Sequence, residues 1–153
     1  MVEYSIVSAE EEHLEEVARN MRLADQNEIW ASHRVTPEAA IDHLRVSRDT
    51  RAGLADGQPV CIFGIDRVSV LSMVGHPWLL GTEGLHRHGI AFLRRNKEYL
   101  DEAKEGFEFL YNYVDARNVA SIAWLRWLGF EVKDAEPYGW LGMPFHRFQM
   151  ETV

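Results

Sequence analysis

The chain has 153 residues, of which 46% are hydrophobic and 26% charged, and its formal net charge is −8 at pH 7. A chain of this length forms one domain, residues 1–153, with one hydrophobic core. The acidic balance, without a cluster of Lys and Arg, disfavours a nucleic-acid partner, and no apolar run reaches the ~20 residues that a membrane helix needs. The acidic N-terminus lacks the basic segment of a signal peptide, so we expect a cytoplasmic location.

The first third of the chain is predicted to form a strand and two helices. Residues 3–7 alternate in the manner of a strand, and Ser8 or Glu10 then opens a helix. Thr36 followed by Pro37 is typical of the start of a second helix, because the hydroxyl caps the first turn and proline is tolerated at the first helical position. The stretch Asn27 to Arg34 is interpreted as the link between the two helices.

The middle of the chain is predicted to form three strands. Arg51 to Ile65 indicates a hairpin, because Asp56-Gly57 supplies the positive φ angles of a tight turn. Val68 to Val74 is an apolar run that fits the next strand, and Gly75-His76-Pro77 would end it. Cys61 lies among apolar residues, which favours a core position over a nucleophile.

The C-terminal part is predicted to form an interior strand, a helix and a last pair of strands. Phe107 to Asp115 has apolar residues on both faces, which is typical of a covered strand. The next helix extends from an N-cap at Asn118 to Gly129, and because it is apolar nearly all round we expect it to be buried on more than one side. Its core residues would be Trp124, Leu128 and Phe130. The order βααβββαβαββ indicates an α/β fold with one mixed sheet and helices on both faces.

The C-terminal helix carries a family resemblance. Gly129 and Phe130 follow Asn118 by eleven and twelve positions, across apolar or small residues. This spacing resembles the C-terminal signature of the GNAT superfamily of acyl-CoA N-acyltransferases. The resemblance implies a mostly antiparallel sheet, an acyl-CoA donor such as acetyl-CoA, and a small-molecule amine or protein as acceptor. It also implies that Asn118 belongs to the donor site and that Trp30 and His33 border the acceptor groove. The alternative is that Trp30 is a satellite core residue and His33 an exposed loop residue.

Four segments carry a narrower resemblance. They are Trp78 to Thr82, Asn112 to Asn118, Trp124 to Phe130, and Pro144 to Phe148. They are similar to the small acetyltransferase-like proteins of tailed phages, the internal virion protein A family. This likeness implies a phage or prophage origin, a location in the host cytoplasm or the virion, and phage structural proteins as partners.

The segment His86 to Ala91 decides how the donor would be held. In GNAT enzymes a loop of pattern Arg/Gln-x-x-Gly-x-Gly/Ala binds the CoA pyrophosphate through backbone N–H groups. Here Gly89 and Ala91 keep the spacing, while His86 replaces the usual first residue. The alternative is a helix that is capped by Thr82 and runs past the glycine to about residue 104. On that alternative the phosphate cradle is absent or degenerate.

Catalytic groups are harder to assign. Many GNAT enzymes use a tyrosine to protonate the leaving thiolate, and the corresponding position here is Leu125. Asp115, Tyr138 and His146 are the candidate catalytic residues, since strand ends gather at ligand sites in open sheets. Asp115 could equally pair with Arg117 in a turn, and His146 could pack in the last hairpin. No His-x-x-x-His pair or carboxylate cluster indicates a metal site.

Two functions follow from these observations. The first is an acyl-CoA-dependent N-acyltransferase, supported by the Asn118 to Phe130 signature and the order of elements. The second is a non-catalytic phage assembly or virion-associated protein that keeps the fold, supported by the phage resemblance, Leu125 and the altered phosphate loop.

Overall fold

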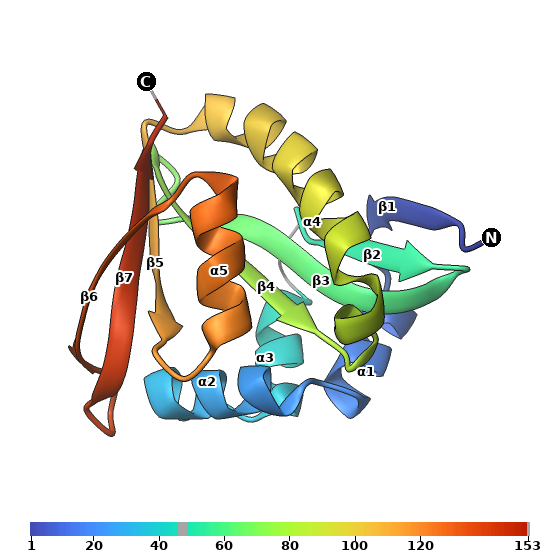
Figure 1. Cartoon of the computed structure of the whole chain (residues 1–153), viewed down its shortest axis with the longest axis horizontal. Helices are drawn as coiled ribbons and strands as arrows, with labels where there is room; N and C mark the ends of the chain where they lie inside the picture. Colours follow the sequence, from blue (N-terminus) through green and yellow to red (C-terminus); the bar gives the residue numbers. More distant parts are fainter. Residues whose placement is uncertain (46–48, 153) are drawn as a thin grey trace.

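The computed structural model describes residues 1–45 and 49–152. In this part of the chain a seven-stranded sheet carries helices on both faces (Figure 1), and no helix has the length and hydropathy to cross a membrane. The elements in chain order are β1 (Tyr4–Ser8), α1 (Glu11–Arg19), α2 (Leu23–His33), α3 (Pro37–Leu44), β2 (Arg51–Ala55), β3 (Gln58–Arg67), β4 (Val74–Gly81), α4 (Gly84–Ala103), the 3-10 turn η1 (Lys104–Gly106), β5 (Phe109–Asp115), α5 (Val119–Leu128), β6 (Glu131–Tyr138) and β7 (Met143–Glu151).

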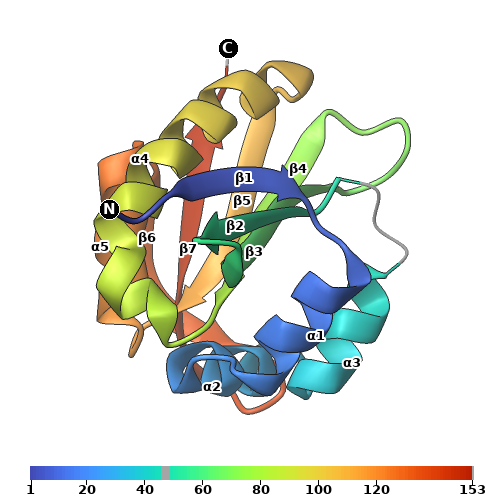
Figure 2. The same ribbon diagram turned by 90° about the vertical axis from the view of Figure 1, so that its right-hand side faces the viewer.

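The sheet has the strand order β1-β2-β3-β4-β5-β7-β6. Neighbouring strands are antiparallel except β4 and β5, which are parallel. Helices α1, α2 and α3 cover one face, while α4 and α5 lie on the other (Figure 2). The predicted fold class is confirmed, and so are the interior position of β5 and the β2–β3 hairpin with its turn at Asp56 and Gly57, whose φ angles are 49° and 81°.

The stretch interpreted as a link, Asn27 to Arg34, belongs to a further helix, α2. Its N-cap, Arg22, makes no side-chain cap hydrogen bond, and Arg34 ends it in the left-handed conformation with φ 56°. Its buried residues are Asp25 and Ala31, so a buried carboxylate replaces the apolar stripe that would have revealed it in the sequence. The helix is held by tertiary contacts rather than by local signals.

The predicted strand at Val68 to Val74 is also wrong, because β4 begins at Val74 and continues through Pro77 to Gly81. The residues before it form the exposed β3–β4 connection, in which Val70 and Leu71 protrude into solvent. Proline is tolerated at position 77 because a backbone N–H there would point toward β5. β4 does not pair with β5 at this position, so no hydrogen bond between the strands is lost.

Helix α5 is less buried than its composition predicted. Ile122 faces the core, whereas Val119 and Trp127 are 72% and 51% exposed. Trp124 and Leu128 are partly buried, and Phe130, just beyond the helix, is fully buried as expected. An apolar helix therefore leaves one face in solvent, where nothing in the described residues covers it.

The sheet opens between its two parallel strands. β4 and β5 pair only at their starts, Val74 with Phe109 and Gly75 with Leu110, and then diverge (Figure 1). Side chains bridge the first part of the opening: His76 Nδ1 lies 2.9 Å from the carbonyl oxygen of Tyr111, and Asn112 Nδ2 donates to the carbonyl of Pro77 at 3.0 Å. Beyond these bridges the two strands leave a passage through the sheet.

Candidate functional site

A cavity of about 820 Å³ runs through this passage. Its walls come from α2 and α3 on one face, from α4 and α5 on the other, and from β4 and β5 between them. We call the part under α2 and α3 the acceptor chamber and the part under α4 and α5 the donor chamber. A cavity of this shape has room for a ligand on each side of the sheet.

Aromatic side chains form the sheet wall of the acceptor chamber. Tyr113 and Tyr138 stack with ring centroids 4.0 Å apart, and His76 meets Tyr111 edge to face at 4.6 Å. Burial raises the pKa of the Tyr138 hydroxyl, so this residue keeps its proton at neutral pH. The wall can enclose an apolar or cationic ligand, because aromatic faces attract cations.

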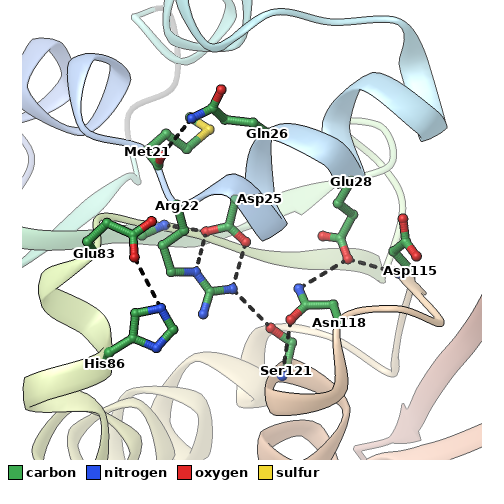
Figure 3. Close-up of polar contacts among 11 residues, drawn as sticks. Met21, Arg22, Asp25, Gln26, Glu28, Glu83, His86, Asp115, Asn118 and Ser121 are labelled. Atoms are coloured by element: carbon green, nitrogen blue, oxygen red, sulfur yellow. Dashed lines mark hydrogen bonds and ion pairs between the residues drawn. The ribbon is translucent and has the colours of Figure 1, made fainter.

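Glu28 of α2 is an acidic group in the wall of this chamber. Its Oε1 accepts a hydrogen bond from the backbone N–H of Asp115 at 2.8 Å and a longer one, 3.5 Å, from Asn118 Nδ2 (Figure 3). Burial raises the pKa of Glu28 to about 7; the charges of Asp25 and Asp115 act in the same direction, and the two hydrogen bonds oppose it. Oε2 receives no hydrogen bond from the described residues. Glu28 is therefore half ionised near neutral pH and has an oxygen free to take a proton.

Asp25, one helical turn before Glu28, is compensated in full. Its carboxylate receives two hydrogen bonds from Arg22, at 2.9 and 3.1 Å, and a third from the backbone N–H of Gly81 at 2.8 Å (Figure 3). Arg22 also reaches Ser121 Oγ of α5 at 3.5 Å. This buried group ties α2 to the end of β4 and the start of α5.

The donor chamber is mostly apolar, with one unsatisfied polar atom. Asn96 of α4 lines the cavity and is only 7% exposed, and its Oδ1 accepts no hydrogen bond within residues 1–45 and 49–152. The backbone of Leu79 faces the same space. The Pro77 carbonyl points toward β5, and residues two apart in a strand direct their N–H and C=O groups to the same side, so those of Leu79 also point toward β5. The chamber thus offers an acceptor and a strand edge to an amide-bearing chain.

The link between β4 and α4, residues Gly81 to Leu85, is where a pyrophosphate cradle would lie, and we call it the β4–α4 corner. The helix begins at Gly84, and only two residues separate it from the end of the strand at Gly81. The Thr82 N–H donates to the Val60 carbonyl at 2.8 Å, and Gly84 and Leu85 donate to Thr82 at 3.2 and 3.0 Å. Of the two helix starts left open by the sequence, the structure has the early one.

The segment His86 to Ala91 consequently lies inside α4. Gly89 packs against α5, because a Cβ at this glycine would lie 3.0 Å from Cζ2 of Trp124. His86 is exposed and contacts Glu83 at 3.2 Å. The backbone N–H groups of this segment are used within the helix and do not face a phosphate.

The predicted catalytic residues do not gather at one place. Asp115 is buried and forms a bidentate pair with Arg117, and although burial alone would raise its pKa, the hydrogen bonds and charge of Arg117 hold that pKa below its ordinary value. Tyr138 lines the acceptor chamber, as does His33. His146 lies in β7 and contacts the carbonyl of Lys133 at 2.7 Å.

Two other predicted residues, Asn118 and Trp30, have contacts with neighbouring elements. Asn118 caps α5 by accepting from the Ser121 N–H at 3.4 Å, and it contacts Glu28. Trp30 packs edge to face on Trp140, which donates its indole N–H to the Trp30 carbonyl at 2.6 Å. Asn118 therefore both caps α5 and contacts Glu28, while Trp30 anchors the β6–β7 turn to α2.

An acyl-CoA donor fits this site only in part. The passage and the donor chamber accommodate an acyl-pantetheine arm, because Asn96 Oδ1 and the edge of β4 match its amides. The β4–α4 corner does not fit the pyrophosphate, since four of its five N–H groups, those of Gly81, Thr82, Gly84 and Leu85, already have acceptors and Asp25 and Glu83 bring carboxylates to it.

Sequence reasoning missed Glu28 and Asn96. Arg22, Asp25 and Glu28 recur every three residues, which places them on one face of a helix once the stretch is interpreted as helical. Asn96 interrupts the buried stripe of α4 between Phe92 and Leu100. In both cases a polar residue at a core position was the available signal.

Comparisons with known proteins bear on the fold. No family model matches the chain, and no curated protein matches it. Among solved structures, yncA of Salmonella typhimurium, described as an acetyltransferase and solved with its cofactor acetyl-CoA, is similar with TM-score 0.68 and 14% identity over 98% of this chain and 94% of that one. An acetyltransferase of the GNAT family from Streptococcus pneumoniae gives 0.61 and 17% over 97% and 99%. The ribosomal-protein-S18-alanine N-acetyltransferase of Escherichia coli gives 0.67 and 17% over 99% and 95%. At these identities the likeness shows a GNAT fold.

Proposed function

We propose that the chain is an N-acyltransferase that moves an acyl group from a thioester to an amine, with Glu28 as the general base. The observation that carries this proposal is the cavity through the β4–β5 passage, which has the Glu28 carboxyl in its wall on one side of the sheet and an apolar chamber on the other. The GNAT fold supports the reaction class, since the similar proteins with this fold are acetyltransferases.

In the proposed reaction the acceptor enters as an ammonium ion and loses a proton to Glu28. The neutral amine attacks the thioester carbonyl, the C–N bond forms, and the C–S bond breaks as the thiolate leaves. The second amine proton passes to the thiolate through water, because Leu125 at the donor wall has no proton to give. A carboxylate with a pKa of about 7 suits proton acceptance at neutral pH.

The acceptor chamber supports a cationic amine as substrate. The tyrosines at positions 111, 113 and 138 present aromatic faces, and Glu28 supplies the negative charge when ionised. Positioning of the two reactants across the passage supplies much of the rate enhancement, since it replaces a bimolecular encounter. Both small amines and peptide N-termini satisfy these requirements.

The test measures thiol release from acetyl-pantetheine and acetyl-CoA with a panel of primary amines and free-N-terminal peptides. We expect Glu28→Gln to lower kcat by at least about a hundredfold, because a positioned general base contributes roughly 10²–10⁴. Glu38→Gln, on the exposed side of α3, is the matched control and should leave kcat unchanged. Thiol release equal in wild type and Glu28→Gln would contradict the assignment of the base.

A second candidate is a non-catalytic phage assembly or virion-associated protein. It is favoured by the exposed apolar face of α5, where Val119 and Trp127 are available to a partner such as a phage structural protein. This candidate places the chain in the host cytoplasm or the virion. Mass spectrometry of virions purified from a lysogen that carries the gene would find the wild-type chain, and Trp127→Glu would exclude it. Virions free of the chain would rule this candidate out.

A further inference from the structure

We infer that the donor is recognised as an acyl-pantetheine thioester and that the nucleotide end of CoA contributes little to binding. This inference rests on the proposed function and names its donor class. It follows from the contrast between the donor chamber, which has groups free to bind amides, and the β4–α4 corner, where four of the five backbone N–H groups already have acceptors.

The first step concerns the N–H groups of the corner. A pyrophosphate site needs several backbone N–H groups directed at one point, and here each of those at Gly81, Thr82, Gly84 and Leu85 already has an acceptor. Binding a phosphate would require breaking the Gly81 bond to Asp25, which also holds the buried Arg22. The corner is therefore a structural joint.

The second step concerns charge. Glu83 is exposed at the N-terminus of α4, where it already interacts favourably with the helix dipole. A pyrophosphate there would meet this carboxylate, and the whole chain carries a net charge of −8. Arg22 does not offset this, because both Asp25 oxygens engage it. Arg87 is exposed, and an ion pair in bulk water is worth little.

The third step concerns the exit from the donor chamber. Trp124 lies in the cavity wall and packs against Gly89, so α4 and α5 touch at this level. An arm that follows the donor chamber cannot pass between the two helices there without moving the indole. The nucleotide would have to lie outside, in solvent.

The fourth step concerns what does bind. Asn96 Oδ1 is buried and unpaired in the described part of the chain, and such a group is costly unless a ligand or water satisfies it. Pantetheine carries two amide N–H groups along its length, and the Leu79 backbone faces the same passage. Asn96 therefore acts as a binding residue for a pantetheine amide.

The experiment compares the equilibrium binding of acetyl-pantetheine, acetyl-CoA and 3′,5′-ADP to the full chain by calorimetry, with tryptophan fluorescence as a second readout because Trp78 and Trp124 line the cavity. We expect the Kd values of the two thioesters to agree within about threefold and 3′,5′-ADP to compete with neither. An enzyme that used the pyrophosphate would bind acetyl-CoA more than about a hundredfold tighter, since each charge-assisted hydrogen bond is worth about tenfold or more.

Three variants sharpen the comparison. Asn96→Leu should weaken both thioesters about five- to tenfold while keeping or raising the melting temperature, because it removes an unsatisfied buried oxygen. Gly89→Ala should change both Kd values by the same factor, since its Cβ would press on the Trp124 indole of the chamber wall and would meet no phosphate. Glu83→Lys should change the ratio of the two Kd values by less than threefold, and Glu105→Lys, in η1 just beyond the far end of α4, is its control for charge.

The outcomes separate the two proposals. Tight binding of acetyl-CoA with weak binding of acetyl-pantetheine, or competition by 3′,5′-ADP, would overturn this inference and leave the acyltransferase proposal standing. If neither acetyl-pantetheine nor acetyl-CoA bound at millimolar concentration, both this inference and the acyltransferase proposal would be overturned. Unchanged affinity in Asn96→Leu would remove Asn96 from the donor site.

Discussion

Two carboxylates of α2, one turn apart, have opposite surroundings. Asp25 at the β4–α4 corner receives hydrogen bonds from Arg22 and from the Gly81 N–H, and it is buried as a fully compensated charge. Glu28 in the acceptor chamber has hydrogen bonds to one oxygen and forms no ion pair among the described residues, and burial raises its pKa to about 7. The comparison shows how one helix supplies a structural joint and a titratable group, according to what faces each carboxylate.

The largest loss of stability is expected from breaking the contacts of Asp25 at the β4–α4 corner. Asp25→Ala would leave the buried Arg22 without its carboxylate and the Gly81 N–H without an acceptor, so it should lower the free energy of unfolding by about 3–5 kcal/mol. Denaturant unfolding of the two chains measures this loss.

The paired variant provides the control. Arg22→Met with Asp25→Leu removes both charges together, and we expect it to be several kcal/mol more stable than Asp25→Ala. Equal destabilisation of the single and double variants would show that the charge pair is not what holds the corner.

The second prediction concerns the stability cost of Glu28. The pKa of Glu28 is higher in the folded chain than in the unfolded chain, so between these two values the folded state keeps a proton that the unfolded state has lost. The stabilisation from the protonated carboxyl is complete below the unfolded pKa of 4.5 and is lost as the pH rises through about 7. Glu28→Gln mimics the protonated form. It should match wild type at pH 4.5 and be more stable above pH 7, by on the order of 3 kcal/mol at most.

Chemical denaturation at pH 4.5 and pH 8 provides the measurement. A difference between Glu28→Gln and wild type that does not change with pH would mean that Glu28 titrates normally, and the contrast with Asp25 would lose its basis. Asp66→Asn, in β3 beside the same cavity, is the control for loss of a carboxylate from the cavity wall.

The smallest effect is expected from introducing a proton donor at position 125. Leu125 lines the cavity, and Leu125→Tyr would add a hydroxyl near the leaving thiolate. We expect kcat to rise about threefold, with Leu125→Phe as the control for ring size alone, because water already relays this proton. A rise in both variants would indicate a packing effect.

Local signals predicted much of the fold correctly. The Thr36 and Asn118 caps, the Asp56-Gly57 turn and the left-handed Gly129 all act through neighbouring residues, so the sequence contains what is needed to recognise them. Where the expectation failed, the cause was tertiary. β4 tolerates Pro77 only because β5 diverges from it, and no pattern in the sequence records that divergence.

The candidate site depended even more on tertiary structure. The raised pKa of Glu28 arises from burial and from two other carboxylates, one of them on β5, which α2 meets only in the folded chain. Asn118 was expected from its spacing to Gly129, whereas its contact with Glu28 joins residues ninety positions apart. Spacing along the chain predicts a cap or a turn and does not predict an electrostatic environment.

The pH dependence of kcat for thiol release, measured with a saturating amine and acetyl-pantetheine, tests the central claim most directly. The account predicts that kcat rises tenfold per pH unit below about pH 7 and levels off above it, following the ionisation of Glu28, and that Glu28→Gln abolishes this step. A wild-type kcat that is independent of pH from 5 to 8, or a step that persists in Glu28→Gln, would contradict it.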